Sequence, residues 1–325
     1  MNTDLIKAVR QAFTEALAVV RETHSKKPHR TGLRVAILQA TAGAYRDAVA
    51  TAESLVTKSA RDNTLRWIVV WQSGRGLFDM ALDTALRIRG QTERNGQMAR
   101  LVSAVASQKR FTEAVAIAER LAGVKRDHAF ADIAQSLQNA GDSANAYQVI
   151  ERIKHHTPRT DAESVFWRQE AKNAPIAQKV SLARKIPDKR QQLFVLFDLA
   201  KRHGLADAAT LAGEIMRSAP VSFARYELTE LAQAQAAVGD VAGAEKTLTT
   251  IGEPFGIYSP TVNVIAALAK RGNTEDALRL VRREPAGRAR SFALTIPGRK
   301  KRFDARIIAV RCALRTLHRS VVRKF

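Results

Sequence analysis

A helix-pair repeat with a period of about 33 residues runs through most of this chain and constrains its fold more than any other sequence feature. The second half of each copy usually opens on a glycine and carries an alanine at a fixed later position. The clear copies of this segment are Gly43–Leu55, Gly76–Ile88, Lys109–Leu121, Gly141–Ile153, Gly204–Met216, Gly239–Ile251 and Gly272–Glu284. Their alanines are Ala48, Ala81, Ala114, Ala146, Ala209, Ala244 and Ala277. Such a period is typical of arrays in which each unit packs only against its neighbours.

Weaker copies extend this pattern. Gln11–Arg21 places an aromatic residue and an alanine as the clear copies do, so we expect the array to begin near the N-terminus. The gap between Gly141 and Gly204 spans about two periods, which predicts a degenerate copy at Ala174–Ile186 with Pro175 near a helix start, where proline is tolerated. The sequence therefore predicts an all-α protein, a right-handed α-solenoid of about eight or nine helix–turn–helix repeats.

Each unit is expected to contain two amphipathic helices. In the copy before Gly141 the apolar residues recur at i, i+3, i+4 and i+7, first as Phe130, Ile133, Ala134 and Leu137 and then as Ala146, Val149, Ile150 and Ile153. The glycine between the two helices suits a left-handed residue at a helix end. Asp142 and Asp240 follow such a glycine and can cap the next helix. The fixed alanine predicts the closest approach of the paired helices. Loops are expected to interrupt the array at Glu22–Gly32, Pro220–Ser222 and Gly252–Pro260.

Composition limits the cellular setting. The chain has one cysteine, Cys312, so an internal disulfide framework is ruled out, and a reducing, cytoplasmic location is expected. Met1–Arg10 has no apolar core of a secretion signal. The apolar run Trp67–Trp71 is far shorter than the roughly 18 residues of a membrane span, so no transmembrane segment is expected.

Positive charge is concentrated near the C-terminus. The net charge is +22, and Arg282–Phe325 contributes 14 basic against 2 acidic residues. We therefore divide the chain into a mildly basic repeat array, residues 1–284, and a basic C-terminal tail or capping helix, residues 285–325. A field of this kind attracts nucleic acid, anionic membrane or acidic protein.

The period, the helix–turn–helix unit and the alanine six residues into the second segment, as in Gly141–Ala146, resemble tetratricopeptide repeats and their relatives. The resemblance covers roughly residues 10–284, and it is divergent because aliphatic residues fill most aromatic and glycine positions of the first tetratricopeptide helix. Pentatricopeptide RNA-binding arrays have a similar period. The resemblance implies an interaction module and leaves open whether the ligand is protein or RNA.

A basic residue recurs at the start of the first helix of successive units. These candidate polyanion- or partner-binding residues are Arg61, Arg94, Arg126, Arg159, Lys189 and Arg225, to which the tail adds Arg299, Lys300, Lys301 and Arg302. Equivalent positions of a solenoid line up, so the first set could form a ladder of cations that follows a nucleic-acid strand or an acidic peptide. The same arginines could instead bridge adjacent repeats, since acidic residues such as Asp62 and Asp127 lie beside them.

The remaining residues give no sign of catalysis. Trp67 and Trp71 lie within an apolar run and are expected in the core. The adjacent His155 and His156 point in different directions on a helix, and no ligand pattern completes a metal site. No phosphate loop, nucleophile elbow or metalloprotease motif occurs. We therefore expect no enzymatic activity, no cofactor and no metal.

Three functions stay open on the sequence. The first is a non-catalytic scaffold or adaptor that binds a partner protein or peptide in its groove. The alternative is an RNA- or DNA-binding array that uses the basic edge and the basic tail, and a helical domain of an enzyme encoded elsewhere is a third. A groove lined by Arg and Lys would favour nucleic acid, whereas a mixed or apolar groove would favour a peptide.

Overall fold

A computed structural model describes residues 28–218, 225–252 and 260–283, with the isolated positions 11, 12, 15 and 18, and gives only the backbone of residues 28–31 and 283. Within these residues the chain is helical and contains no strand. The expected copy at Gln11–Arg21 and the tail at residues 285–325, with Arg299, Lys300, Lys301 and Arg302, fall wholly or largely outside them. So do most residues of two expected loops, Pro220–Ser222 and Gly252–Pro260.

Contacts divide the chain into two compact units, Met1–Phe166 and Trp167–Phe325. The helices of the first unit are α2 (Pro28–Thr41), α3 (Tyr45–Glu53), α4 (Lys58–Gly74), α5 (Phe78–Leu86), α6 (Gln91–Ser107), α7 (Phe111–Glu119), α8 (Gly123–Asn139) and α9 (Ser143–Glu151). The border falls inside α10 (His156–Asn173). The second unit continues with α11 (Ile176–Arg184), α12 (Lys189–His203), α13 (Ala206–Ser218), α14 (Arg225–Val238), α15 (Val241–Ile251), α16 (Pro260–Arg271) and α17 (Thr274–Arg283).

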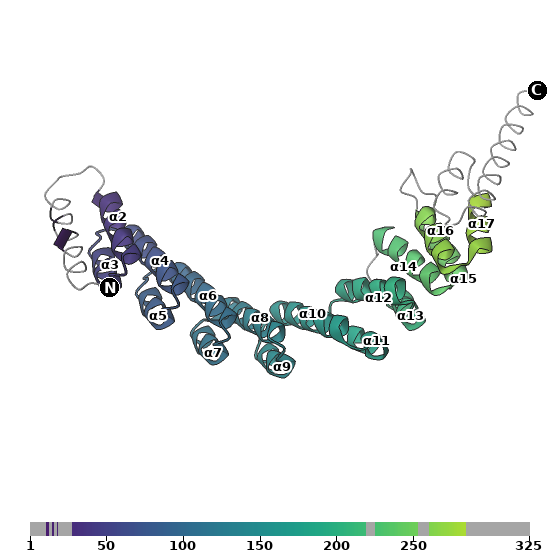
Figure 1. The fold of residues 1–325 in the computed structure, drawn as a ribbon, viewed down its shortest axis with the longest axis horizontal. Helices are drawn as coiled ribbons and strands as arrows, with labels where there is room; N and C mark the ends of the chain where they lie inside the picture. The colour runs from purple at the N-terminus through teal and green to yellow at the C-terminus, as the bar shows by residue number, and fades with distance from the viewer. Residues whose placement is uncertain are drawn as a thin grey trace, which may run out of the picture. The chain divides into compact units, whose positions relative to one another are not determined.

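We call the even-numbered helices A helices and the odd-numbered ones B helices. In each unit an A helix packs against its own B helix, against the next A helix, and against the B helix that precedes it. In the first unit α4, α6 and α8 lie in one row, and α5, α7 and α9 project from one side of that row (Figure 1). Within each compact unit, contacts between successive A helices thus build a layer, as expected for an all-α array whose repeats meet only their neighbours.

The repeat register is confirmed by burial. The alanines at the fixed position are almost completely buried in every clear copy: Ala48, Ala81, Ala114, Ala146, Ala209, Ala244 and Ala277. Apolar clusters join neighbouring pairs, as where Tyr45 and Ala48 of α3 pack with Leu65 and Ile68 of α4. Small residues at these positions let the helix axes approach closely, so a larger side chain would overpack the seam.

The backbone at the turns also confirms the expectation. Gly43, Gly76 and Gly141 have φ values of 83°, 75° and 87°, in the left-handed region that favours glycine. Lys109 occupies the same place in its copy with a φ of 63°, and it is the one non-glycine residue with positive φ among those that the structure describes. Asp142 and Asp240 cap α9 and α15 by accepting backbone hydrogen bonds, as expected.

One expected boundary was wrong and one was right. Glu22–Gly32 was expected to be a loop, but α2 begins at Pro28 and includes Gly32. Proline lacks an N–H and is favoured in the first turn of a helix, so Pro28 can start one as readily as it can mark a loop. The degenerate copy is confirmed, because α11 begins directly after Pro175.

Candidate functional site

Two buried aspartates of the array, Asp62 and Asp127, link one helix pair to the next. Each is the fifth residue of its A helix and is buried. Asp62 accepts hydrogen bonds from the N–H groups of Arg89 and Gly90, at 3.2 and 2.8 Å, just before α6 begins. Asp127 accepts them from Lys154 and His155, at 3.2 and 2.8 Å, just before α10. These carboxylates therefore bind N–H groups at the start of the next A helix.

Their electrostatics follow from these contacts. Burial acts to raise the pKa of both carboxyl groups, but the backbone N–H donors together with the adjacent side chain, Arg61 at Asp62 and His155 at Asp127, outweigh it and hold the pKa below the ordinary value. His155 also places its Nδ1 atom 2.6 Å from Asp127 Oδ2, which contributes to the lowering. His155 thus has a carboxylate partner that its sequence context did not indicate, while His156 is exposed.

The candidate cations make mostly local contacts. Arg61 is 7% exposed and lies with its Nη2 atom 3.3 Å from Asp62 Oδ1, so little of it can meet a ligand. Arg126 lies over the Phe130 ring, 4.8 Å from its centroid, with Nη1 4.0 Å from Asp127 Oδ1. Arg94 donates to the carbonyl of Ile88 at 3.4 Å, just before its own helix.

The later members of this set are more exposed. Arg159 pairs with Glu163 at 2.9 Å on the same helix, a contact that raises the pKa of Arg159. Lys189 is exposed and donates to Gln192 at 3.1 Å. Arg225 is exposed at the start of α14. The hydrogen bonds to the next helix pair are thus made by Asp62 and Asp127, and not by the neighbouring Arg61 and Arg126.

Other arginines bridge adjacent repeats instead. Three arginines of the B-helix layer pair with a glutamate of the preceding repeat. Arg87 and Arg152, at the ends of α5 and α9, pair with Glu53 and Glu119, and Arg279, in the middle of α17, pairs with Glu245. At the ends of the A helices, two arginines donate to carbonyls at the end of the preceding A helix: Arg75 to Ala40 and Thr41, and Arg271 to Ala237. Part of the basic surplus therefore has a structural role that the sequence pattern did not reveal.

The expectation that Trp67 and Trp71 lie in the core is wrong. In α4 the side chains of Trp67, Val70 and Trp71 are 43%, 42% and 38% exposed, and Leu38 of the adjacent α2 is 54% exposed. The five residues Trp67–Trp71 run more than once around the helix, whereas one helix face meets the core. Ile68 and Val69 take the buried face, so the tryptophans remain outside.

These residues belong to a surface that we call the A-face, the exposed side of α2, α4, α6, α8 and the part of α10 up to Phe166. Trp67, Arg100, Asp132 and Val165 each occupy the tenth position of their A helix, so the repeat brings them into one row. Ser103 of α6 donates to Asp132 of α8 at 2.7 Å, which confirms that neighbouring helices meet along this row.

The A-face is basic and apolar at its start. Arg34, Arg66 and Arg100 lie on α2, α4 and α6, and Arg34 and Arg100 make no hydrogen bond or ion pair with any residue that the structure describes. Arg66 donates to the amide oxygen of Asn63 at 2.6 Å, which is an uncharged partner. Arg75 lies over the ring of Trp71, with 5.7 Å between its Cζ atom and the ring centroid.

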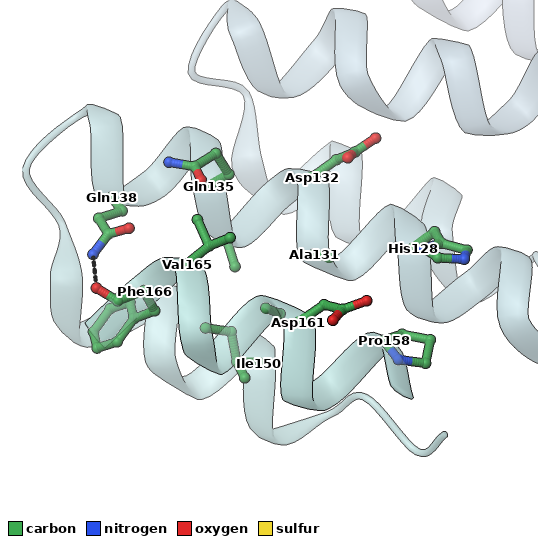
Figure 2. A pocket seen from close by; sticks show the side chains of 12 residues that line it. His128, Ala131, Asp132, Gln135, Gln138, Ile150, Pro158, Asp161, Val165 and Phe166 are labelled. Atoms are coloured by element: carbon green, nitrogen blue, oxygen red, sulfur yellow. Dashed lines mark hydrogen bonds between the residues drawn. The ribbon is translucent and has the colours of Figure 1, made fainter. Parts of the chain in front are cut away.

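Farther along, the A-face is acidic and hollowed. A cavity of about 230 Å³ lies between α8 and α10. Figure 2 shows His128 and Asp132 of α8 beside Asp161 of α10 at this hollow, with Gln138 donating to the carbonyl of Phe166 at 3.0 Å. Beyond their first turns, α8 and the part of α10 in the first unit contain no lysine or arginine. The sign of the charge therefore reverses along the A-face.

Within the described residues, no group of three or more His, Cys, Asp or Glu is placed to hold a metal ion. Among the helices described, none is long and apolar enough to cross a membrane.

No family model matches the chain, and no curated protein matches it either. Among solved structures, the chain is similar to Ton1535 from Thermococcus onnurineus NA1, with 14% sequence identity and a TM-score of 0.25, over 86% of this chain and 99% of that chain. A TM-score this low does not establish a common fold.

Proposed function

We propose that this protein is a non-catalytic scaffold or adaptor that binds an extended segment of a partner protein along the A-face of its first unit. On this proposal it is a divergent tetratricopeptide-like array, right-handed, with about eight or nine repeats. The buried alanines at one position of each copy and the stacking of each pair on the next support that classification. The single cysteine supports a cytoplasmic location.

The observation that carries the proposal is the exposed stripe of Trp67, Val70 and Trp71. Contiguous exposed apolar side chains are a feature of surfaces that bind other proteins. Tryptophan and arginine are also the residue types enriched where interfaces gain most of their binding energy. The A-face is mixed and partly apolar rather than lined by lysine and arginine, which is the composition that favours a peptide.

The nucleic-acid alternative draws its support from tryptophans beside arginines, the usual elements of a base-stacking platform. Two features of the A-face weigh against it. A polyanion that followed the row from Trp67 would meet Asp132 and Asp161 after α6, and phosphates would be repelled there. In addition, the guanidinium of Arg75 already covers part of the Trp71 ring. Polyanion affinity of the segment Arg282–Phe325 stays a separate prediction.

The test is to recover the intact protein from its own cells, with and without nuclease, and to identify what accompanies it. We expect a protein partner that survives nuclease and is lost from the double variant Trp67→Ser, Trp71→Ser. The matched control is Met80→Ser, Leu86→Ser, which removes exposed apolar side chains from α5 and should retain the partner. Recovery of nucleic acid alone, or equal recovery by both variants, would refute the proposal.

A further inference from the structure

We propose that the segment bound at the start of the A-face is acidic and amphipathic: its apolar side chains cover Leu38, Trp67, Val70 and Trp71, and its carboxylates pair with Arg34, Arg66 and Arg100. This inference rests on the proposed function and specifies the chemistry of the partner. It concerns the part of the A-face formed by α2, α4 and α6, which we call the aromatic patch.

The apolar part of the patch is continuous across two packed helices. Trp67, Val70 and Trp71 follow the i, i+3, i+4 spacing, so they form one stripe on α4. Leu38 lies on α2, which packs directly against α4, and the Thr41 carbonyl near it accepts from the Arg75 that covers Trp71. Tryptophan side chains supply large contact areas, so two of them, each more than one-third exposed, leave substantial apolar surface for a partner.

Positive charge predominates around the patch. Neither α2 nor α4 carries an exposed acidic residue, because α2 has none and the only one in α4, Asp62, is buried against α6. Glu93, in the first turn, is the only acidic residue of α6, and it lines the same hollow as Arg66. Arg34 and Arg100 therefore have no anionic partner among the described residues, and an incoming carboxylate would supply one.

The neighbours of the tryptophans favour carboxylates on an apolar peptide over phosphates on a nucleic acid. Leu38 and Val70 offer aliphatic surface, which has no flat face on which a base can stack. An amphipathic helix or an extended strand presents apolar side chains at regular intervals with acidic ones between them, and this arrangement matches a patch that has apolar residues inside and arginines around it.

The experiment is a selection from a displayed library of random 16-residue peptides, with the intact protein as target and the Trp67→Ser, Trp71→Ser variant for counter-selection. We expect the retained peptides to be rich in Asp and Glu and to carry apolar residues at helical or alternating spacing. Peptides rich in Lys and Arg, with few acids, would overturn this inference while leaving peptide binding at the A-face standing. The absence of any peptide retained by the intact protein but not by the variant would overturn both.

Tryptophan fluorescence then places the selected peptide. The chain has three tryptophans, and Trp167→Phe leaves only the two of the aromatic patch. Binding should shift their emission to the blue, and the variant Arg34→Gln, Arg66→Gln, Arg100→Gln should weaken binding about tenfold, since three exposed ion pairs are lost. The matched control Arg46→Gln, Arg120→Gln, Arg184→Gln removes three exposed cations that lie in or directly after B helices and should bind as before. Equal affinity of the two variants, or a blue shift produced by oligouridylate and not by peptide, would overturn the inference.

Discussion

Replacing Lys109 by glycine should raise the free energy of unfolding, although no contact is gained. Lys109 has a φ of 63°, and its exposed side chain has no hydrogen bond or ion pair with a described residue. A left-handed conformation costs a residue with a Cβ atom about 1–2 kcal/mol. Glycine removes that cost but loses about 0.5–1 kcal/mol through the greater freedom of the unfolded chain. The net expectation is stabilisation by about 0.5–1 kcal/mol.

Urea unfolding followed by circular dichroism measures this change. With a denaturant slope of about 2–3 kcal/mol per molar, the midpoint should rise by about 0.3 M. The matched control is the preceding residue, because Gln108 has a φ of −90° and gains no relief from glycine. Gln108→Gly should therefore lower the midpoint. If both substitutions lowered it alike, the left-handed turn and the register of the repeat at α6 and α7 would be refuted.

Three further predictions follow from the packing and the ion pairs. Ala146→Leu should overpack the contact between α8 and α9 and cost about 1–3 kcal/mol, seen as faster hydrogen exchange across Phe130–Ile153; unchanged exchange there would contradict the register. Because folding lowers the pKa of Asp127, the ionised carboxylate stabilises the folded state. This stabilisation should be complete above the ordinary pKa of 3.8 and should disappear as the pH falls through the lower pKa of the folded state. Asp127→Asn should thus lower the free energy of unfolding by about 1–2 kcal/mol at neutral pH and by little in strong acid. Chemical denaturation at several pH values measures this difference, and a difference that did not change with pH would contradict the explanation. Arg61→Gln should cost about 1–3 kcal/mol because Arg61 is buried against Asp62, whereas Arg100→Gln should stay within about 0.5 kcal/mol; equal thermal midpoints would contradict that assignment.

The helix pairs and their register could be predicted because local sequence determines both. The glycines and the alanines are required by a left-handed turn and by a close helix approach, and each requirement acts within one repeat. Lys109 was placed correctly in the pattern even though it replaces a glycine, because the apolar residues around it keep their spacing.

The candidate site could not be predicted in the same way. Apolar periodicity identifies a helix but does not say which of two apolar faces meets the core, and α4 has apolar residues on both. The sequence indicated the exposed tryptophans only through the run Trp67–Trp71, because five consecutive apolar residues cannot all point to one side of a helix. The partners of Asp62 and Asp127 lie in the next repeat. These N–H donors and the bridging arginines can be identified only when it is known how successive helix pairs pack on one another.

The carboxylate links at Asp62 and Asp127 restrict how such an array can be lengthened or shortened by gene duplication. Asn95 holds the fifth position of α6, where Asp62 and Asp127 stand in α4 and α8, and it makes no corresponding bond to a described residue. A deletion that joined α4 to a helix start without suitably placed N–H groups would leave a buried carboxylate without donors, whereas a junction after α6 would not. Within the first unit, a junction after α6 would therefore break no such carboxylate link, whereas a junction after α4 or α8 would.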